Sequence, residues 1–268
     1  VIRLRDLVFA DPNETIGNIA KPALTVSPET SLEDLEQFFD EHDIAAVPVV
    51  DDKQSLLGIV RRRAVLEALT ERAEADHLKA AGIIGGDELR SMPVIVRSRR
   101  RLAWLSINIG LNIVAASVIA AYEDTLTAVI ALAVFLPIVS DMSGCSGNQA
   151  VAVSMRELTL GAARTGDVMR VWRKEAIVGM INGIALGALL GIAAWAWKGN
   201  PVLGLVVGAA LAANTVIAVS SGGTVPLILR RFKLDPAVAS GPLLTTVTDM
   251  CGFFLLLSMA SLVLPMLS

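Results

Sequence analysis

Long apolar runs alternate with short polar connections in the second half of the chain. Five such runs lie at about 102–122, 126–155, 176–197, 202–229 and 236–265. A helix needs about 20 consecutive apolar residues to cross the hydrocarbon core of a bilayer, and each run has that length. The pattern therefore predicts an all-α domain of five transmembrane helices over residues 102–268.

The first part of the chain has a different pattern. Leu32, Leu35, Phe38 and Phe39 recur at the spacing of one helix face, and short apolar runs at 46–50 and 56–60 flank a polar turn. With a strand near residue 25 and a helix over 61–69, residues 21–70 are predicted to form an α+β module of order β-α-β-β-α. Residues 71–101 read as a charged connecting helix and linker, in which Gly82, Gly85 and Gly86 break the helix.

Composition and charge support this division. Hydrophobic residues make up 54% of the 268 residues, and the mean hydropathy is +0.62. Residues 1–96 contain 18 acidic and 10 basic residues, whereas residues 97–268 contain 8 and 13. The basic residues fall between apolar runs and form no continuous stripe, so a nucleic-acid partner is not expected.

The positions of the basic residues predict the orientation in the membrane. Short loops rich in Lys and Arg stay on the cytoplasmic side. All three basic connections fall on one side of the five predicted spans, which places the N-terminus in the cytoplasm and the C-terminus outside. These residues are Arg97 and Arg99–Arg101, then Arg156, Arg164, Arg170, Arg173 and Lys174, and finally Arg230, Arg231 and Lys233.

Two acidic residues lie inside the predicted spans. Ionisable groups at bilayer depth usually face a protein interior or a water-filled path. Asp249 has hydroxyl neighbours at Thr245, Thr246 and Thr248 that could line the same cavity, and Asp141 precedes a glycine-rich stretch. The alternatives are a hydrogen-bonded structural acid for Asp249 and a hydrated position near the cytoplasmic end of the span for Asp141.

The stretch SDMSGCSGNQAVAVS (140–154) interrupts the second apolar run with small and polar residues. It has no lysine and no preceding strand, which excludes a phosphate-binding loop. Irregular backbone at membrane depth is tolerated only where it lines a cavity or is buried in protein. Exposed carbonyls of this stretch and the amides of Asn148 and Gln149 would suit a hard cation or its water shell. A kinked helix with a packing motif is the alternative.

Other polar positions in the spans have simpler explanations. Asn214, Thr215 and the run 220–226 in the fourth span are typical of helix packing, and Asn108 and Asn112 in the first span are expected to bond between helices. Cys145 and Cys251 lie in apolar stretches and predict buried free thiols rather than a disulfide. No catalytic Ser-His-Asp set lies within the spans, so an enzyme is not expected. The oxygen-only chemistry points to ions such as Mg²⁺.

These motifs resemble the MgtE family of magnesium transporters and channels, and the resemblance extends over essentially the whole chain. Its most specific parts are LPIVSDMSGCSGNQA (136–150) and RRFKLDPAVASGPLLTTVTD (230–249), together with Gly252. The module at 21–70 resembles a CBS domain, and residues 1–20 look like the tail of a preceding one, so the chain reads as truncated at its N-terminus. The family resemblance implies an inner-membrane protein of bacteria.

The resemblance also implies a homodimer whose ion path runs between subunits and is lined by the second and fifth spans. The family's pore acid corresponds to Asp249, and its glycine-asparagine run corresponds to Gly144, Gly147, Asn148 and Gln149. This chain departs from the family pattern in two places. Ser143-Gly144-Cys145 stands where Gly-Gly-Asn is common, and Asp141 stands where a small neutral residue is usual, so ion selectivity could differ.

In the family the cytoplasmic part senses Mg²⁺, and the connecting helix closes the pore when ions bridge acidic faces. The acidic excess of residues 1–96 favours such divalent screening. ATP binding is a further possibility in CBS domains: Asp6 fits the nucleotide-contact position in the first copy, whereas Ala64 occupies it in the complete copy. Candidate regulatory Mg²⁺ ligands are Asp51, Asp52, Glu71, Glu74, Asp76, Asp87 and Glu88.

Two other functions stay open at the level of the sequence. The first is an ion-coupled carrier for Mg²⁺ or another divalent cation such as Co²⁺ or Mn²⁺. The second is a non-conducting membrane sensor that signals through its CBS module.

Overall fold

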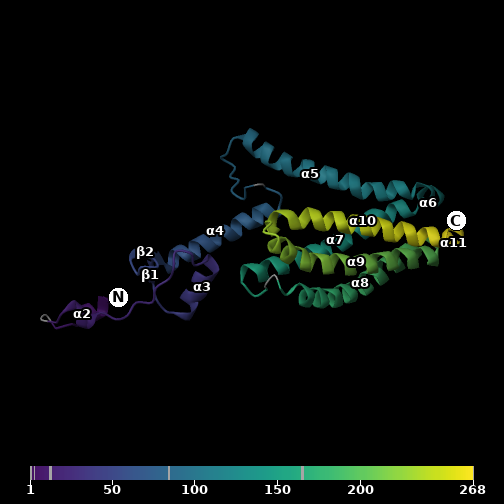
Figure 1. Ribbon diagram of the computed structural model, residues 1–268. Coiled ribbons are helices and arrows are strands. Elements are labelled where there is room, and N and C mark those ends of the chain that lie inside the picture. Colours follow the sequence, from purple (N-terminus) through teal and green to yellow (C-terminus); the bar gives the residue numbers. More distant parts are fainter. Residues whose placement is uncertain (1, 3, 12–13, 84, 164–165, 268) are drawn as a thin grey trace. The chain divides into compact units, whose positions relative to one another are not determined.

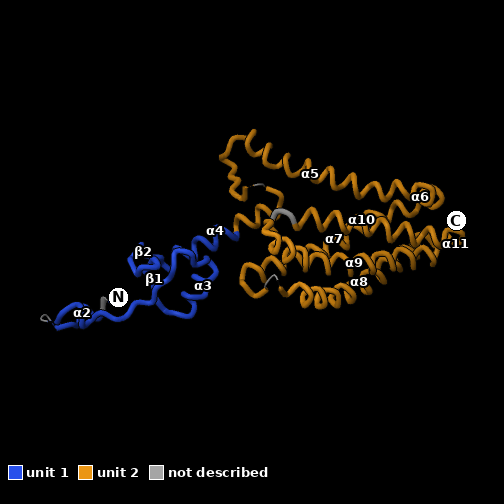
Figure 2. The backbone as a smooth tube through the Cα atoms, in the orientation of Figure 1, with its two compact units in different colours: residues 1–73 blue, residues 74–268 orange. Residues whose placement is uncertain are grey.

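The computed structural model describes every residue except 1, 3, 12–13, 84, 164–165 and 268 (Figure 1). The chain divides into two compact units, Val1–Ala73 and Glu74–Ser268, coloured blue and orange in Figure 2. Each unit has its own hydrophobic core.

Unit 1 contains short helices and a small antiparallel sheet. Its elements are α1 (Leu4–Val8), α2 (Ile16–Ile19), α3 (Leu32–Glu41), β1 (Ala46–Val50), β2 (Leu56–Arg61) and the start of α4 (Arg62–Ala80). The strands pair from Ala46↔Arg61 to Val50↔Leu56, with an irregularity between Val49 and Val50. At the position of the first predicted strand, the structure has a parallel bridge between Val26 and Val49. With this bridge counted as the first strand, the predicted order β-α-β-β-α is confirmed.

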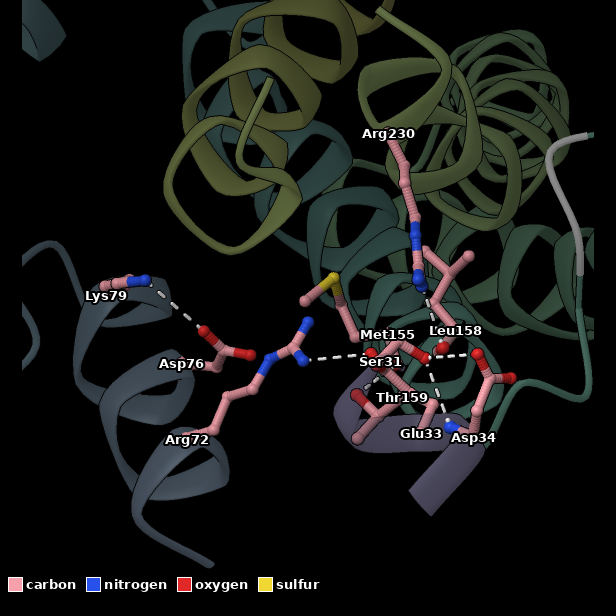
Figure 3. Close-up of polar contacts among 10 residues, drawn as sticks. All are labelled: Ser31, Glu33, Asp34, Arg72, Asp76, Lys79, Met155, Leu158, Thr159 and Arg230. Atoms are coloured by element: carbon pink, nitrogen blue, oxygen red, sulfur yellow. Dashed lines mark hydrogen bonds and ion pairs between the residues drawn. The ribbon is translucent and has the colours of Figure 1, made fainter. Parts of the chain in front are cut away.

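The predicted apolar face of α3 forms the core of unit 1. Phe39 is 2% exposed and packs with Val26, Val47 and Val65, while Leu32, Leu35 and Phe38 cover this cluster. Ser31 caps α3 by accepting a hydrogen bond from the amide of Asp34 at 3.1 Å. Beside the cap, Arg72 of α4 donates to Glu33 at 2.9 Å (Figure 3). These contacts tie the first turn of α3 to α4.

Unit 2 is built almost entirely from long helices. These are the end of α4, α5 (Val94–Ala121), α6 (Glu123–Ala128), α7 (Leu132–Thr159), α8 (Val168–Lys198), α9 (Pro201–Arg231), α10 (Pro236–Leu262) and α11 (Leu264–Leu267). Among the described residues, α5, α8, α9 and residues 240–262 of α10 are long and apolar enough to cross a membrane. α7 is as long as α5, but its polar stretch lowers its hydropathy.

The central helix of this bundle is α9. The most apolar window of α9 is 61% buried, against 6% for α5 and 17% for α8. Glycines bring α8 and α9 into close contact: a Cβ atom on Gly187 would lie 2.5 Å from the carbonyl oxygen of Gly208. Because apolar lipid supplies no hydrophobic force between helices, membrane helices associate largely through close packing, which small residues permit.

The basic connections lie at one end of the bundle, as the charge pattern predicts. The start of α5, the α7–α8 connection and the α9–α10 connection share the end opposite α6 and α11 (Figure 1). At this end Arg230 of α9 donates to the carbonyl of Leu158 on α7 at 2.9 Å (Figure 3).

The connection between α4 and α5 differs from the sequence-based prediction. α4 runs unbroken from Arg62 to Ala80, and α5 begins at Val94 rather than at 102, so the basic cluster is helical. Between them Gly82, Gly85 and Gly86 adopt positive φ angles of 83°, 103° and 68°. Only glycine adopts such angles without strain, which explains why the helix stops there.

Ion pairs hold this connection against the bundle. Glu88, whose side chain is 3% exposed, pairs with Arg97 at 3.0 Å and also with Arg101. The guanidinium of Arg101, followed by that of Arg97, lowers the pKa of Glu88 below its usual value. Asp87 pairs with Arg100 at 2.6 Å. The last turns of α4 are anchored separately, because Lys79 donates to Asp235 at 3.0 Å.

The prediction that Asn108 and Asn112 bond between helices is wrong. Asn108 donates to the carbonyl of Trp104 at 3.3 Å, and Asn112 donates to that of Asn108 at 2.8 Å. Both acceptors lie one turn earlier in α5, so each amide donates a hydrogen bond within its own helix.

Candidate functional site

Asp249 lies at the midpoint of α10, equally far from Pro236 and Leu262. At 1.5 Å per residue it is about 20 Å from either end of this helix. The hydroxyl of Ser140 on α7 donates a hydrogen bond to its carboxylate. The two helices thus meet at a partly buried carboxylate in the middle of an otherwise apolar segment.

The expectation of irregular backbone at 140–154 is wrong. α7 is helical from Leu132 to Thr159, with Pro137 inside it. The helix uses the backbone carbonyls of this stretch for its own hydrogen bonds. The glycines serve helix contact instead: a Cβ atom on Gly147 would lie 2.9 Å from the carbonyl oxygen of Ala218 on α9 and 3.0 Å from Leu244 on α10. The packing alternative explains Gly147.

The polar stretch of α7 has two faces with different surroundings. One face is buried against α9 and α10 and consists of small residues: Ser140, Ser143, Ser146, Gly147, Ala150 and Ser154. The other face is exposed and carries Asp141, Cys145, Asn148 and Gln149. Gly144 lies between them, with a Cβ position 3.6 Å from the hydroxyl of Thr248. The expectation that both cysteines are buried is wrong for Cys145, which is exposed.

The three threonines near Asp249 do not share one face. Thr245 is exposed, Thr246 is partly buried and Thr248 is fully buried. Each hydroxyl donates to a carbonyl of the preceding turn: Thr245 to Gly241, Thr246 to Pro242 and Thr248 to Thr245. Thr245 and Thr246 remain on the side of α10 that is open in this chain, whereas Thr248 faces α7 and α9.

Sequence reasoning missed a buried polar cluster beside Asp249. Asn214 of α9, 0% exposed, donates to the hydroxyl of Ser143 at 2.5 Å and to the backbone carbonyl of Thr248 at 3.0 Å. Ser140 was missed as well. The usable signal is the spacing of serines at 140, 143 and 146, which puts them on one helix face.

The candidate regulatory acids lie in different surroundings. Asp76, Asp87 and Glu88 are paired with Lys79, Arg100 and the Arg97–Arg101 pair. Asp51 accepts hydrogen bonds from the amides of Lys53 and Ser55 and shapes the turn between β1 and β2. Asp52, Glu71 and Glu74 are exposed. Within the described part of the chain, no three His, Cys, Asp or Glu side chains gather closely enough to hold a metal ion.

The candidate nucleotide residue, Asp6, lies in α1. One of its carboxylate oxygens lies 3.4 Å from Nζ of Lys21. Lys21 thus pairs with the acid that was expected to contact a nucleotide.

Comparison with known proteins finds matches in two parts of the chain. Residues 16–71 match the CBS domain model, and residues 136–259 match the MgtE model, described as a divalent cation transporter. Proteins named magnesium transporter MgtE are 34% identical in Thermus thermophilus, over 98% of this chain and 59% of that protein, and 31% identical in Bacillus subtilis, over 97% and 58%.

A third protein of the same name, from Enterococcus faecalis, is 31% identical over 98% of this chain and 58% of its own length. The chain thus spans under three fifths of the length of each of these relatives. Transporter relatives and the four apolar helices found among the described residues together indicate an integral membrane protein. The chain therefore carries a segment that matches the CBS domain, followed by a segment over residues 136–259 that matches the MgtE domain.

Proposed function

We propose that this chain conducts Mg²⁺ across a membrane along a path lined by α7 and α10. The observation that carries the proposal is the carboxylate of Asp249 at the centre of α10, held by a hydrogen bond from Ser140 of α7. An ionisable residue at this depth is costly unless it serves an ion path or a buried pair. No Lys or Arg lies between Arg101 and Arg156 or between Lys233 and Ser268 to neutralise it from within the α7 and α10 segments.

The chemistry of the lining favours a hydrated hard cation. Mg²⁺ dehydrates reluctantly and is usually held through its water shell by one or two carboxylates. Asp249 and Asp141 supply carboxylates, and Asn148 and Thr245 supply neutral oxygens on the exposed sides of the two helices. The relatives' name, magnesium transporter, favours this ion over Co²⁺ and Mn²⁺ and a transporter over an enzyme.

The exposure of this surface supports a homodimer. Asp141, Cys145, Asn148 and Gln149 of α7, together with Thr245 of α10, are exposed in the isolated chain. Polar side chains that face lipid cost free energy, whereas those that face a water-filled path keep their hydration. Two copies that oppose these surfaces would enclose such a path. Gly147 permits the close approach of α7 to α9 and α10 on which the lining depends.

Regulation by cytoplasmic Mg²⁺ is part of the same proposal. Residues 1–96 carry 18 acidic and 10 basic residues, so divalent ions would relieve their mutual repulsion. The exposed acids Asp52, Glu71 and Glu74 are the best ligands among the candidates, since Asp76, Asp87 and Glu88 are neutralised by basic partners. The basic end of the bundle would lie on the cytoplasmic side of a bacterial inner membrane.

The experiment is Mg²⁺ uptake into proteoliposomes that contain an Mg²⁺-sensitive fluorescent indicator. The proposal predicts an uptake rate well above that of protein-free vesicles. Electrical currents that correspond to more ions per second than a carrier can turn over would identify a channel rather than an ion-coupled carrier. Absence of uptake in folded, inserted protein would favour the non-conducting sensor. Uptake of Co²⁺ or Mn²⁺ in preference to Mg²⁺ would assign a different cargo.

A further inference from the structure

Asn214 joins three helices at one point beneath the proposed ion path. Its side-chain nitrogen donates to the hydroxyl of Ser143 on α7 at 2.5 Å and to the backbone carbonyl of Thr248 on α10 at 3.0 Å. The residue is 0% exposed and belongs to α9, the most buried of the long apolar helices. The carbonyl of Thr248 can only accept, which fixes the amide with its nitrogen toward α7 and α10.

The two acceptors of Asn214 flank the pair formed by Ser140 and Asp249. Ser143 lies one helical turn after Ser140, and Thr248 immediately precedes Asp249 in α10. A shift or rotation of either helix would break one of the two Asn214 bonds and would also separate the Ser140 hydroxyl from the Asp249 carboxylate. The Asn214 bonds and the Ser140–Asp249 bond therefore require the same relative placement of α7 and α10.

We propose that Asn214 is a positioning residue that fixes α7 against α10 and so holds Asp249 in the geometry in which it meets the ion. Its side chain does not itself line the path. The ion-handling half of this statement rests on the proposed function, whereas the positioning half concerns the helices alone. Asn214 thereby becomes a determinant of how tightly and how selectively Asp249 holds a hydrated divalent cation.

The space around the amide fits this role. A Cβ atom on Gly252, one turn after Thr248, would lie 2.7 Å from the Asn214 nitrogen. Gly252 is thus the residue that gives the amide access to the backbone of α10. On the opposite side, Ser143 donates its own hydrogen to carbonyls of α7, those of Val139 at 2.8 Å and Ser140 at 2.9 Å. Its oxygen is therefore oriented to accept from Asn214.

A purely structural role is the alternative, and the neighbouring residue supplies a matched control. Thr215 is also 0% exposed, but its hydroxyl donates only within α9, to the carbonyl of Leu211 at 2.8 Å. Thr215→Val removes a buried hydroxyl from the same helix without touching a bond between helices. Asn214→Leu removes both bonds between helices at similar volume.

The positioning half can be tested without any transport. A cysteine pair is introduced by Gly144→Cys and Thr248→Cys on a background of Cys145→Ser and Cys251→Ser, because the Cβ position at 144 lies 3.6 Å from the Thr248 hydroxyl. Purified protein in lipid is treated with a membrane-permeant oxidant, and the linked peptides are quantified by mass spectrometry. The cross-linking rate should fall about tenfold in Asn214→Leu, a decrease that matches the loss of two hydrogen bonds. It should stay unchanged in Thr215→Val.

Gly252→Ala provides a second perturbation that leaves Asn214 itself intact. It presses on the amide and should slow the cross-link as well, whereas Gly241→Ala, with open space at its Cβ position, should not. An unchanged cross-linking rate in both Asn214→Leu and Gly252→Ala would overturn the positioning role, whatever the protein transports.

Uptake kinetics test the ion-handling half. Asn214→Leu should raise the Mg²⁺ concentration at half-maximal uptake and lower the preference for Mg²⁺ over Ca²⁺. Its combination with Ser143→Ala should cost less than the sum of the single changes, because both remove the same bond. An equal loss of maximal rate in Asn214→Leu and Thr215→Val, with unchanged half-saturation, would reduce Asn214 to a stability role.

Discussion

Ser140 and Asp249, 109 residues apart in the sequence, are joined by a hydrogen bond between α7 and α10. The bond engages one oxygen of a carboxylate that is only partly buried. In our account this carboxylate holds the water shell of the transported ion. The account makes predictions about each component of this arrangement.

Removal of the Ser140 hydroxyl should weaken transport without unfolding the bundle. Hydrogen bonds to charged groups contribute about 1.5–3 kcal/mol, so Ser140→Ala should lower Mg²⁺ uptake by roughly tenfold. Ser146→Ala is the matched control, since the Ser146 hydroxyl donates to Met142 within α7 at 3.2 Å. Equal uptake in the two variants would show that the Ser140 bond does not matter for transport.

Substitution of the glycines between α7 and α9 should destabilise the bundle. A Cβ atom on Gly222 would collide with the carbonyl of Gly147, and overpacking of this kind costs about 1–3 kcal/mol. Gly222→Ala should therefore lower the thermal unfolding midpoint in detergent by several degrees. Gly110→Ala, on α5 with nothing near its Cβ position, should leave the midpoint in place. A midpoint that does not change in Gly222→Ala would contradict the close approach of the two helices.

Cys145 should be accessible from water if the exposed face of α7 lines the ion path. A charged methanethiosulfonate reagent should modify Cys145 in lipid-embedded protein, and saturating Mg²⁺ should slow the reaction. The measurement uses Cys251→Ser protein, in which Cys145 is the remaining thiol of the chain, with Cys145→Ser as control. A thiol that reacts only with apolar, membrane-soluble reagents would place this face against lipid and would contradict the dimeric path.

Acid should release the linker from α5. Because Arg101 and Arg97 lower the pKa of Glu88, its ion pairs are fully present above the usual carboxyl pKa of about 4.3. They are lost as the pH falls through the lower folded-state value. The protection factors of the amides of residues 85–92, which correct for the slower intrinsic exchange in acid, should fall on acidification below that value, and Glu88→Gln should lower them at neutral pH.

The control for this prediction is Glu67→Gln, which breaks an exposed pair with Arg63 inside α4. It should leave the exchange of the linker unchanged. Linker exchange that is the same at neutral pH in Glu88→Gln and in the unaltered protein would show that the ion pairs do not dock it.

The sequence was sufficient for those features that periodicity and composition determine. The apolar face of α3, the paired strands and the CBS assignment agree with the structure and the comparisons. The long apolar runs predicted helices of spanning length, and the position of Asp249 within one of them identified the candidate acid. These features depend on residues near one another in the sequence, and a single sequence reports such patterns directly.

Contacts between helices could not be predicted in the same way. Whether Ser140 faces Asp249, and whether Asn214 reaches Ser143, depends on the rotation and shift of whole helices. The stretch at 140–154 was misjudged for a related reason: its glycines were interpreted as backbone irregularity, whereas Gly147 allows contact with Ala218 in a regular helix. Small and polar residues at helical spacing fit both an irregular backbone and a regular helix with a packing face. Only the position of the neighbouring helix decides between the two.

The most direct test of the central claim is Mg²⁺ uptake by proteoliposomes that carry Asp249→Asn. The substitution keeps the size of the side chain and its ability to accept from Ser140, but it removes the negative charge. Asp124→Asn, which neutralises an exposed acid in the first turn of α6, is the matched control. Our account predicts near-complete loss of uptake in Asp249→Asn and unaltered uptake in Asp124→Asn. Uptake by Asp249→Asn at the rate of the unaltered protein would contradict it.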